Sequence, residues 1–393
     1  MSDLLRSAMA ARMAKLPAEL PPMDDENDDE YESADSLGSL PGSGLGPPAV
    51  PRLRPKSTPK RSPNPDFAPL SASDYFAEAL QVAVPERDLD VRAYYTPPKF
   101  EGGTVLVCHH GAGYSGLSFA CFAKEVVGMT RGEVGVLALD ARRHGKTRST
   151  ASPEPSALDI DTLVADFVAI VRTVFPSAAG SSPPPLLLIG HSMGGAVVAH
   201  ASPLLQSAPE KYHLLGVAVL DVVEGSAIEA LPHMQNLLNA RPDGWDSIEE
   251  AVEWHVKTKT IRNNHSARVS VPGIIQPAAL SETPQVAHAY VWRTPLRSTA
   301  PYWMSWFQNL SATFLAARTA RLLLLAGTDR LDKPLMIAQM QGKFQLEVMG
   351  GGVGHVLHED DPTRAAEILL EFWRRNDTSK LKLPVKIKGV GEV

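Results

Sequence analysis

Short runs of apolar residues, separated by polar and glycine-rich turns, recur along the chain from Thr104 onward. Runs of this length and composition are typical of strands that are buried on both faces of a sheet. The segments that fit the pattern are Thr104 to Cys108, Val134 to Leu139, Leu186 to Ile189, Leu214 to Leu220, Leu322 to Ala326 and Phe344 to Val348. We therefore expect a mostly parallel, doubly wound sheet of the α/β class.

Between these runs, apolar residues recur at the spacing of a helix face, most clearly in Leu158 to Val174. Gly194 to Leu205, Ser247 to Lys257 and Thr363 to Trp373 show the same spacing. Alternation of strand and helix places ligand-binding loops at the carboxyl ends of the strands. The alternation is interrupted from Glu224 to Ala316, and we expect this insertion to form a helical cap over those ends.

The insertion contains an aromatic-rich stretch, made up of Tyr290, Trp292, Tyr302, Trp303, Trp306 and Phe307. Aromatic side chains supply large buried apolar areas, so the simplest interpretation of the stretch is structural. We expect most of these residues to form the cap's own core.

The two ends of the chain differ in composition from the rest. Residues 1–66 are rich in proline and contain an acidic run, Asp24 to Glu30, and a Gly/Ser/Pro stretch, Ser36 to Pro51. Such a segment cannot bury enough apolar surface to offset its ordering entropy. We expect a disordered tail at 1–66, a folded domain at 67–375 and a Lys-rich tail at 376–393. The basic cluster Arg52 to Arg61 is interpreted as a solvated linker, with a nuclear address or a docking patch as the alternatives.

Composition and charge exclude several classes of protein. Of the 393 residues 44% are hydrophobic, and the net charge of −6 disfavours nucleic acid as a partner. The absence of an 18-residue apolar run argues against a membrane span, and Met1 to Leu20 lacks the apolar region of a secretory signal. The only cysteines, Cys108 and Cys121, exclude a disulfide framework and a Cys-based zinc site. A reducing compartment, cytoplasmic or nuclear, is therefore expected.

The strongest chemical signal is the segment Gly190-His191-Ser192-Met193-Gly194, which follows an apolar strand and opens an Ala/Val-rich helix. Small residues around the serine suit a sharp strand-to-helix turn that presents its hydroxyl group to a substrate. The pattern predicts a nucleophile elbow with Ser192 as the nucleophile. The backbone N–H of Met193 and that of Ala112, in the loop His110 to Gly113, are the expected donors of an oxyanion hole. His191, within the elbow, is interpreted as a packing or orienting residue.

A serine nucleophile needs a histidine to accept its proton and a carboxylate to orient that histidine. In hydrolases of this type the histidine follows the last strand, where His355 and His358 are candidates. His355 is favoured because it follows a flexible glycine-rich loop. For the acid, Asp221 after one strand and Asp329 or Asp332 after a later strand remain nearly even by spacing alone, and Glu224 is a further candidate.

Several blocks give the chain a more specific character. They are LDARRHGKT, LIGHSMGGAVVAH, LDVVEGSAIEALPHMQNLL, IRNNHSARVSVPG, LLLLAGTDRLDKPL, MQGKFQLEVM and GHVLHED, all between Phe67 and Trp373. With these blocks the chain resembles the protein phosphatase methylesterases. These enzymes have the α/β-hydrolase fold and remove the methyl ester from the carboxy-terminal leucine of the protein phosphatase 2A catalytic subunit.

The resemblance implies a catalytic triad of Ser192, Asp221 and His355, with Asp329 in a structural role. It implies serine esterase chemistry without a metal or organic cofactor, and the phosphatase catalytic subunit as both substrate and partner. It further implies that phosphatase docking arranges the triad, with the cap as the docking surface. Two alternatives use the same residues differently: a general small-molecule carboxylesterase or lipase, and a noncatalytic scaffold with the hydrolase fold.

Overall fold

The computed structural model describes residues 62–152, 157–177, 182–207, 211–281, 287–327 and 331–377. The predictions for the acidic run, for the basic cluster Arg52 to Arg61, for the Lys-rich tail and for Asp329 lie outside the described residues. Among the described residues, no helix combines the length and the apolar character needed to span a bilayer.

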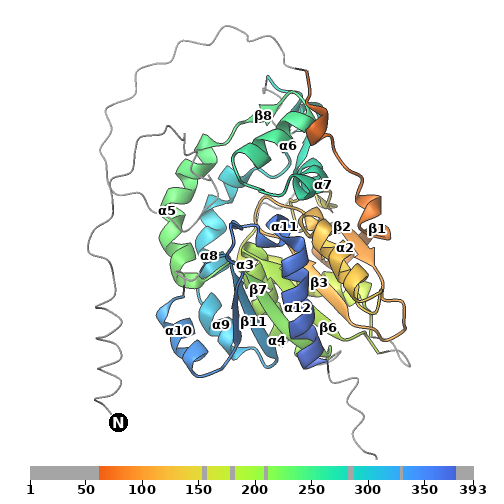
Figure 1. Cartoon of the computed structure of the whole chain (residues 1–393), viewed down its shortest axis with the longest axis vertical. Helices are drawn as coiled ribbons and strands as arrows, with labels where there is room; N and C mark the ends of the chain where they lie inside the picture. Colours follow the sequence, from red (N-terminus) through yellow and green to blue (C-terminus); the bar gives the residue numbers. More distant parts are fainter. Residues whose placement is uncertain are drawn as a thin grey trace, which may run out of the picture. The chain divides into compact units, whose positions relative to one another are not determined.

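The described part of the chain is built around one large sheet (Figure 1). Its strands are β1 (Glu78–Val84), β2 (Leu89–Thr96), β3 (Val105–His109), β4 (Gly135–Leu139), β5 (Arg148–Ser149), β6 (Leu186–His191), β7 (Leu214–Leu220), β11 (Ala320–Leu325) and β12 (Gln345–Val348). They follow the order β1-β2-β4-β3-β6-β7-β11-β12, and β5 pairs with β2. The strands from β4 to β12 in this order are parallel, whereas β1, β2 and β5 are antiparallel to their neighbours.

Helices cover both faces of this sheet. In the described part of the chain, the α-helices outside the insertion are α2 (Ala120–Met129), α3 (Ile160–Val174), α4 (Met193–Gln206), α10 (Lys333–Met340), α11 (Leu357–Asp360) and α12 (Pro362–Asn376). Alternate residues of a strand join opposite cores: Leu188 of β6 packs on the side of α3 and α4, and Ile189 packs on the side of α2 and α12. Burial on both faces explains why β3, β4, β6 and β7 are continuous apolar runs.

The six strands predicted from apolar runs are confirmed, each with its ends within two residues of the prediction. The four predicted helices are confirmed with similar accuracy. Outside the insertion, the sequence pattern missed β1, β2, β5, α2, α10 and α11. In β1 and β2, exposed or half-exposed residues alternate with apolar ones, so these strands carry no continuous apolar run.

The segment between β7 and β11 contains α5 (Glu224–Ala240), β8 (Gly244–Trp245), α6 (Ile248–Lys257), α7 (Asn264–Ile274), β9 (Ile275–Pro277), β10 (Tyr290–Trp292), α8 (Trp303–Phe307) and α9 (Leu310–Ala316). Strands β8, β10 and β9 form a small separate sheet. In Figure 1, α6 and α7 lie above the large sheet, and α5 runs down on its left side. This segment therefore contributes both a second sheet and several helices near the strand ends.

The prediction that most of its aromatic residues form a separate cap core is wrong. Trp303, Trp306 and Phe307 are buried in the core on the α3 and α4 side of the large sheet, and Tyr302 packs against that core. Tyr290 and Trp292 pack in the smaller core of the insertion. The reason is that α8 lies against α4, so the aromatic side chains of α8 pack into the main core beside the large sheet.

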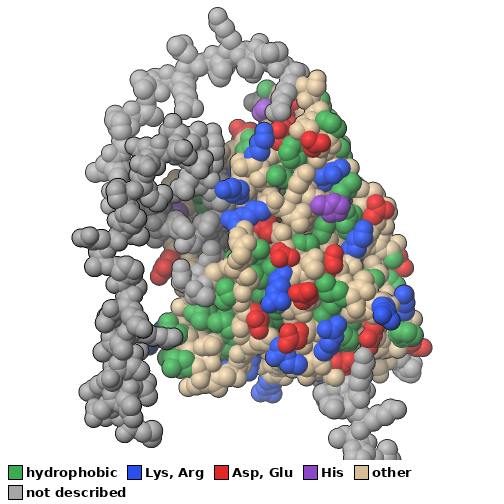
Figure 2. Space-filling model, in the orientation of Figure 1, with side chains coloured by type: hydrophobic (Ala, Val, Ile, Leu, Met, Phe, Trp, Pro, Cys, Tyr) green, Lys and Arg blue, Asp and Glu red, His purple; other side chains and the backbone are tan. Residues whose placement is uncertain are grey.

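Acidic and basic side chains are interspersed over the face shown in Figure 2, with no large area of one sign. This distribution offers no extended basic surface on that face.

Candidate active site

Ser192 lies at the tight turn between β6 and α4. Its backbone has φ 51° and ψ −119°, a conformation that a non-glycine residue rarely adopts. The neighbouring glycines are required by space: a Cβ atom at Gly190 would collide with the backbone of Gly194, and one at Gly194 with the backbone of His109. The predicted strand-to-helix elbow is thus present, and strain of this kind typically occurs at functional sites.

Asp221 and His355 come together at the carboxyl ends of β7 and β12. His355 Nδ1 donates a hydrogen bond to Asp221 Oδ2 over 2.9 Å, while Asp221 Oδ1 accepts one from the N–H of Ala326, also over 2.9 Å. The Asp221 side chain is completely buried and that of His355 is 9% exposed. The bond to Asp221 places the ring proton on Nδ1, so Nε2 is left as the nitrogen that can accept a proton.

The other candidate acids have different partners. The two carboxylate oxygens of Glu224 accept the N–H groups of Asn309 and Ser311, at 3.0 Å each. Asp332 caps α10 through the N–H of Leu335 and also accepts the hydroxyl group of Ser311. Of the acids that the structure describes, Asp221 is the one that reaches His355.

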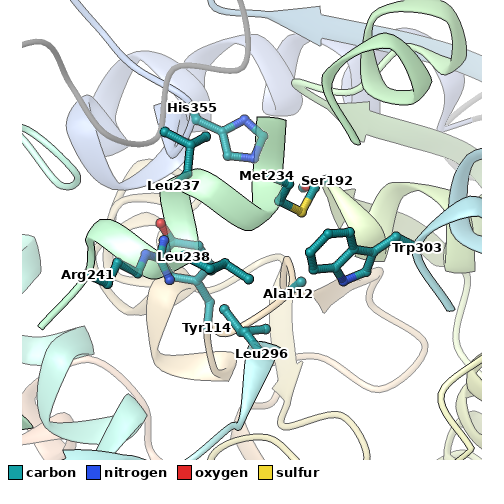
Figure 3. A pocket seen from close by; sticks show the side chains of 10 residues that line it. All are labelled: Ala112, Tyr114, Ser192, Met234, Leu237, Leu238, Arg241, Leu296, Trp303 and His355. Atoms are coloured by element: carbon teal, nitrogen blue, oxygen red, sulfur yellow. The ribbon is translucent and has the colours of Figure 1, made fainter. Parts of the chain in front are cut away.

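Ser192 and His355 border the same pocket, which has a volume of about 80 Å³. Figure 3 shows the imidazole ring of His355 on the same side of the pocket as Ser192. The rest of the wall is mostly apolar, with Met234, Leu237 and Leu238 from α5, and with Ala112, Tyr114, Arg241, Leu296 and Trp303. An apolar pocket beside a serine and a histidine suits a neutral ester with an apolar side chain.

The two expected oxyanion donors flank the serine from different elements. Met193 is the first residue of α4, and a residue there has no intrahelical partner for its N–H. Ala112 lines the pocket, in a loop that is shaped by the buried His110. His110 Nδ1 donates to the Gly111 carbonyl over 2.7 Å, and its Nε2 accepts the N–H of Ala141. Burial lowers the pKa of His110 well below its usual value, which keeps the ring neutral.

His191 contacts the loop that carries His355. The sequence predicted a packing or orienting role for His191, but not which residues it would contact. Its Nε2 donates to the backbone carbonyl of His355 over 2.8 Å, and the two rings are 4.7 Å apart. Burial lowers the pKa of His191 well below its usual value. A neutral His191 therefore holds the backbone of His355 without adding charge near it.

A second support of the His355 loop was missed by sequence reasoning. Asp360 Oδ2 accepts the N–H of Gly354 over 2.6 Å, and its Oδ1 accepts the N–H of Arg262 over 2.7 Å. The guanidinium group of Arg262 in turn donates to the carbonyl of Gly352. Arg262 belongs to the block IRNNHSARVSVPG and Asp360 to GHVLHED, so the unusual character of these two blocks was the available signal.

The fold and this site define the class of the protein. The sequence model of the family described as "Alpha/beta hydrolase family" matches residues 106–368. The crystal structure of E-2-(acetamidomethylene)succinate hydrolase superimposes with a TM-score of 0.57 at 15% identity, covering 75% of this chain and 98% of that one. The chain belongs to the α/β hydrolases.

More similar sequences narrow the assignment. A protein from Cryptococcus neoformans named protein phosphatase methylesterase 1 is 48% identical over 354 residues, covering 83% of this chain and 82% of that protein. The protein of the same name from Schizosaccharomyces pombe is 41% identical, covering 80% of this chain and 87% of that protein. The chain is a member of the protein phosphatase methylesterase family and a carboxylic ester hydrolase.

Proposed function

We propose that this enzyme hydrolyses the methyl ester on the carboxy-terminal leucine of the protein phosphatase 2A catalytic subunit. The observation that carries the proposal is the hydrogen bond between His355 and Asp221, together with the apolar pocket that His355 and Ser192 both line. The names of its relatives support a phosphatase as the substrate. The apolar wall supports a leucine side chain next to the reacting ester.

In this mechanism Ser192 Oγ attacks the ester carbonyl carbon while His355 Nε2 takes the hydroxyl proton. The negative charge on the former carbonyl oxygen is stabilised by the N–H groups of Met193 and Ala112. The tetrahedral intermediate collapses, and methanol leaves with the proton from His355. Water, deprotonated by His355, then attacks the acyl-enzyme, and the leucine carboxylate is released. Asp221 keeps the imidazole in the required tautomer and stabilises its protonated form.

The test compares two substrates in parallel: the intact methylated phosphatase core and a free peptide methylated at its carboxy-terminal leucine. We expect hydrolysis of both, with a large preference for the intact phosphatase, and methanol release measures it. The variant Ser192→Ala should lose at least about 1000-fold in turnover. It should still bind the phosphatase in a pull-down.

Three outcomes would contradict the proposal. Equal rates on the intact phosphatase and on short acyl esters without a protein part would indicate a general carboxylesterase. Normal hydrolysis by Ser192→Ala would remove the serine mechanism. Binding of the phosphatase without any hydrolysis by the wild-type enzyme would indicate a noncatalytic scaffold.

A further inference from the structure

The loop between β3 and the short 3₁₀ helix η4 (Gly116–Phe119) carries Ala112, the proposed second oxyanion donor. Residues 109–119 are all buried except Ala112, which is partly exposed and lines the catalytic pocket. Figure 3 shows Ala112 in the pocket wall near Leu296. The direction of this one backbone N–H group therefore depends on the contacts that fix the two ends of the loop.

His110 fixes the first end of the loop. Its Nδ1 donates to the carbonyl of Gly111, while its Nε2 accepts the N–H of Ala141 over 2.9 Å. Ala141 lies two residues after the end of β4, the strand that pairs with β3. Because burial lowers the pKa of His110, the ring is neutral and joins the start of the loop to the end of the neighbouring strand without adding a charge.

Asp140 fixes the second end of the loop, also from the end of β4. Its Oδ1 accepts the N–H of Gly116 over 2.7 Å, and its Oδ2 accepts the N–H of Lys146, also over 2.7 Å. The side chain of Ser115 does not cap η4, so the carboxylate of Asp140 supplies the acceptor for the first N–H group of this helix. Asp140 belongs to the block LDARRHGKT, which contributes no residue to the proposed triad.

The carboxylate of Asp140 is completely buried. Burial raises the pKa of Asp140 to about 6, while the two backbone N–H donors and the guanidinium groups of Arg92 and Arg293 act against this increase. Burial and the charge of Asp140 raise the pKa of the neighbouring Tyr94, which stays neutral. At pH 8 Asp140 is therefore ionised, and both of its oxygens accept charge-assisted hydrogen bonds.

Between its two fixed ends the loop is closely packed. Gly113, directly after Ala112, has φ 81°, and a Cβ atom there would lie 2.5 Å from Leu296 Cδ1. A Cβ atom on Gly116 would lie 3.0 Å from the ring of Tyr94. The loop thus turns sharply at Ala112 and meets neighbouring side chains on both sides of the turn.

We propose that Asp140 is a positioning residue of the oxyanion hole, and that it acts together with His110. The two side chains fasten both ends of the loop to the end of β4, and this directs the Ala112 N–H toward the reacting carbonyl oxygen. The inference rests on the proposed function, because it takes Ala112 as an oxyanion donor. Neither side chain lines the catalytic pocket. Their effect therefore falls on the transition state, where the oxyanion forms, and not on substrate binding.

The test measures hydrolysis, at pH 8, of a short peptide methylated at its carboxy-terminal leucine. Asp140→Asn retains the shape of the side chain, but its amide accepts at one oxygen only and turns an N–H donor toward one of the two backbone N–H groups. We expect kcat to fall by about 10- to 100-fold, the cost of a misplaced donor, with KM changed less than about twofold.

Variants of His110 test the other end of the loop. His110→Leu removes both hydrogen bonds and should lower kcat to a similar extent. His110→Gln retains an acceptor for the N–H of Ala141, so it should recover part of the loss. Combined with Asp140→Asn, His110→Leu should cost little more than the more severe single variant, because both act through one donor. A combined loss equal to the product of the two single losses would contradict the shared donor.

An alkyl boronic acid separates positioning from a general loss of structure. Ser192 Oγ bonds to boron, the hydroxyl proton passes to His355, and an oxygen of the anionic adduct takes the place of the oxyanion. In Asp140→Asn the inhibition constant should rise by about the same factor as kcat falls, while KM stays unchanged. The inference would be overturned by an unchanged kcat, or by a loss of kcat without the matching rise in the inhibition constant.

The matched control lies near the opposite end of β4. Thr130→Val removes a buried hydroxyl group that donates to the carbonyl of Val126 and accepts the N–H of Val134. It should lower the melting temperature and leave kcat and the inhibition constant unchanged. Thermal unfolding shows which variants are folded, and the two His110 variants decide the same comparison should Asp140→Asn be unfolded. Hydrolysis of the peptide ester by the wild-type enzyme, without hydrolysis of the methylated phosphatase, would end the proposed function and leave this inference standing.

Discussion

At the scale of single residues, the site depends on backbone positions that tolerate few side chains. Ser192 and Asp221 both have positive φ, 51° and 48°, although neither is a glycine. Gly111 allows the loop of Ala112 to pass close to the elbow. A Cβ atom there would lie 2.7 Å from His191 Nδ1 and 3.2 Å from Ser192 Cβ. The loop that carries Ala112 is thus packed directly against Ser192 and His191.

Gly111→Ala should therefore lower esterase activity. The added methyl group has to displace His191 or Ser192, and an error of about 1 Å in the site costs roughly 100-fold in rate. The matched control is Gly128→Ala in α2, where nothing lies within 4 Å of the added atom. Gly128→Ala should retain full activity and gain about 0.5–1 kcal/mol in the free energy of unfolding, measured by urea denaturation. Equal activities of the two variants would contradict the packing argument.

Asp221→Asn tests the orienting acid. An amide retains the shape of the side chain but stabilises the wrong tautomer of His355 and cannot stabilise its protonated form, so we expect kcat to fall by about 10⁴. The control is Asp332→Asn, because Asp332 caps α10 and does not contact His355. Because asparagine caps a helix about as well as aspartate, this variant should change stability little and leave kcat unchanged. A large loss of kcat in Asp332→Asn with an unchanged kcat in Asp221→Asn would place the orienting acid after the later strand, β11.

At the scale of elements, β12 and α11 flank the loop that carries His355, the proposed catalytic histidine. Asp360 of α11 accepts the N–H of Gly354, next to His355, and the N–H of Arg262, just before α7. This one carboxylate therefore joins the insertion to the loop that carries His355. A displacement of α7 would move Arg262, and the hydrogen bonds of Arg262 to Asp360 and Gly352 would then move the loop that carries His355.

Asp360→Asn should lower kcat by about 10- to 100-fold on a small methyl ester, with KM nearly unchanged. The amide group accepts at only one oxygen, so one of the two N–H groups faces an N–H donor instead. Arg262→Ala should lower kcat in the same direction, because it removes the contact with Gly352. Steady-state kinetics separates this positioning role from a loss of substrate binding. A rise in KM with an unchanged kcat would contradict it.

The elements that could be predicted from the sequence are those in which burial alone determines the pattern of apolar and polar residues. Strands buried on both faces, such as β6 and β7, are apolar throughout, and Ser192 follows directly from the elbow motif. Strand β1 is half exposed at the edge of the sheet, so its weak alternation of apolar and polar residues did not identify it as a strand. The role of Asp360 could not be predicted, because it depends on a contact with Arg262, which lies far away in the sequence. The choice of Asp221 over the later acids likewise needed the family resemblance first and the contact with His355 afterwards.

At the scale of the whole molecule, an unusual number of titratable groups lies buried around the active site. Burial lowers the pKa of several histidines, to about 4 for His109 and His144, to about 3 for His358, and well below the usual value for His110 and His191. These rings are neutral in the folded protein at pH 7, whereas in the unfolded chain they take up protons below about pH 6.5. Their contribution to stability is therefore complete above about pH 6.5 and is lost as the pH falls toward 4.

Glu359 has the opposite effect on the pH dependence of stability from that of the buried histidines. It is completely buried, its Oε2 accepts the hydroxyl group of Ser266 in α7 over 3.1 Å, and burial raises its pKa to about 8. The folded state therefore holds a proton that the unfolded chain releases above about pH 4.5. Its contribution is present below that pH and is lost as the pH rises through 8, because the folded state binds more protons than the unfolded state over this range.

Glu359→Gln should remove this loss, because a neutral amide retains the acceptor for Ser266 and never ionises. We expect the melting temperature of the variant to match that of the wild-type protein near pH 4, to exceed it increasingly as the pH rises to about 8, and to keep a constant excess above that. Scanning calorimetry over that range measures the difference. Glu367→Gln, an exposed change on α12, is the control and should leave the pH profile unaltered, apart from the small term of its pair with Arg364. A difference that shrinks with rising pH would mean that Glu359 is ionised in the folded protein.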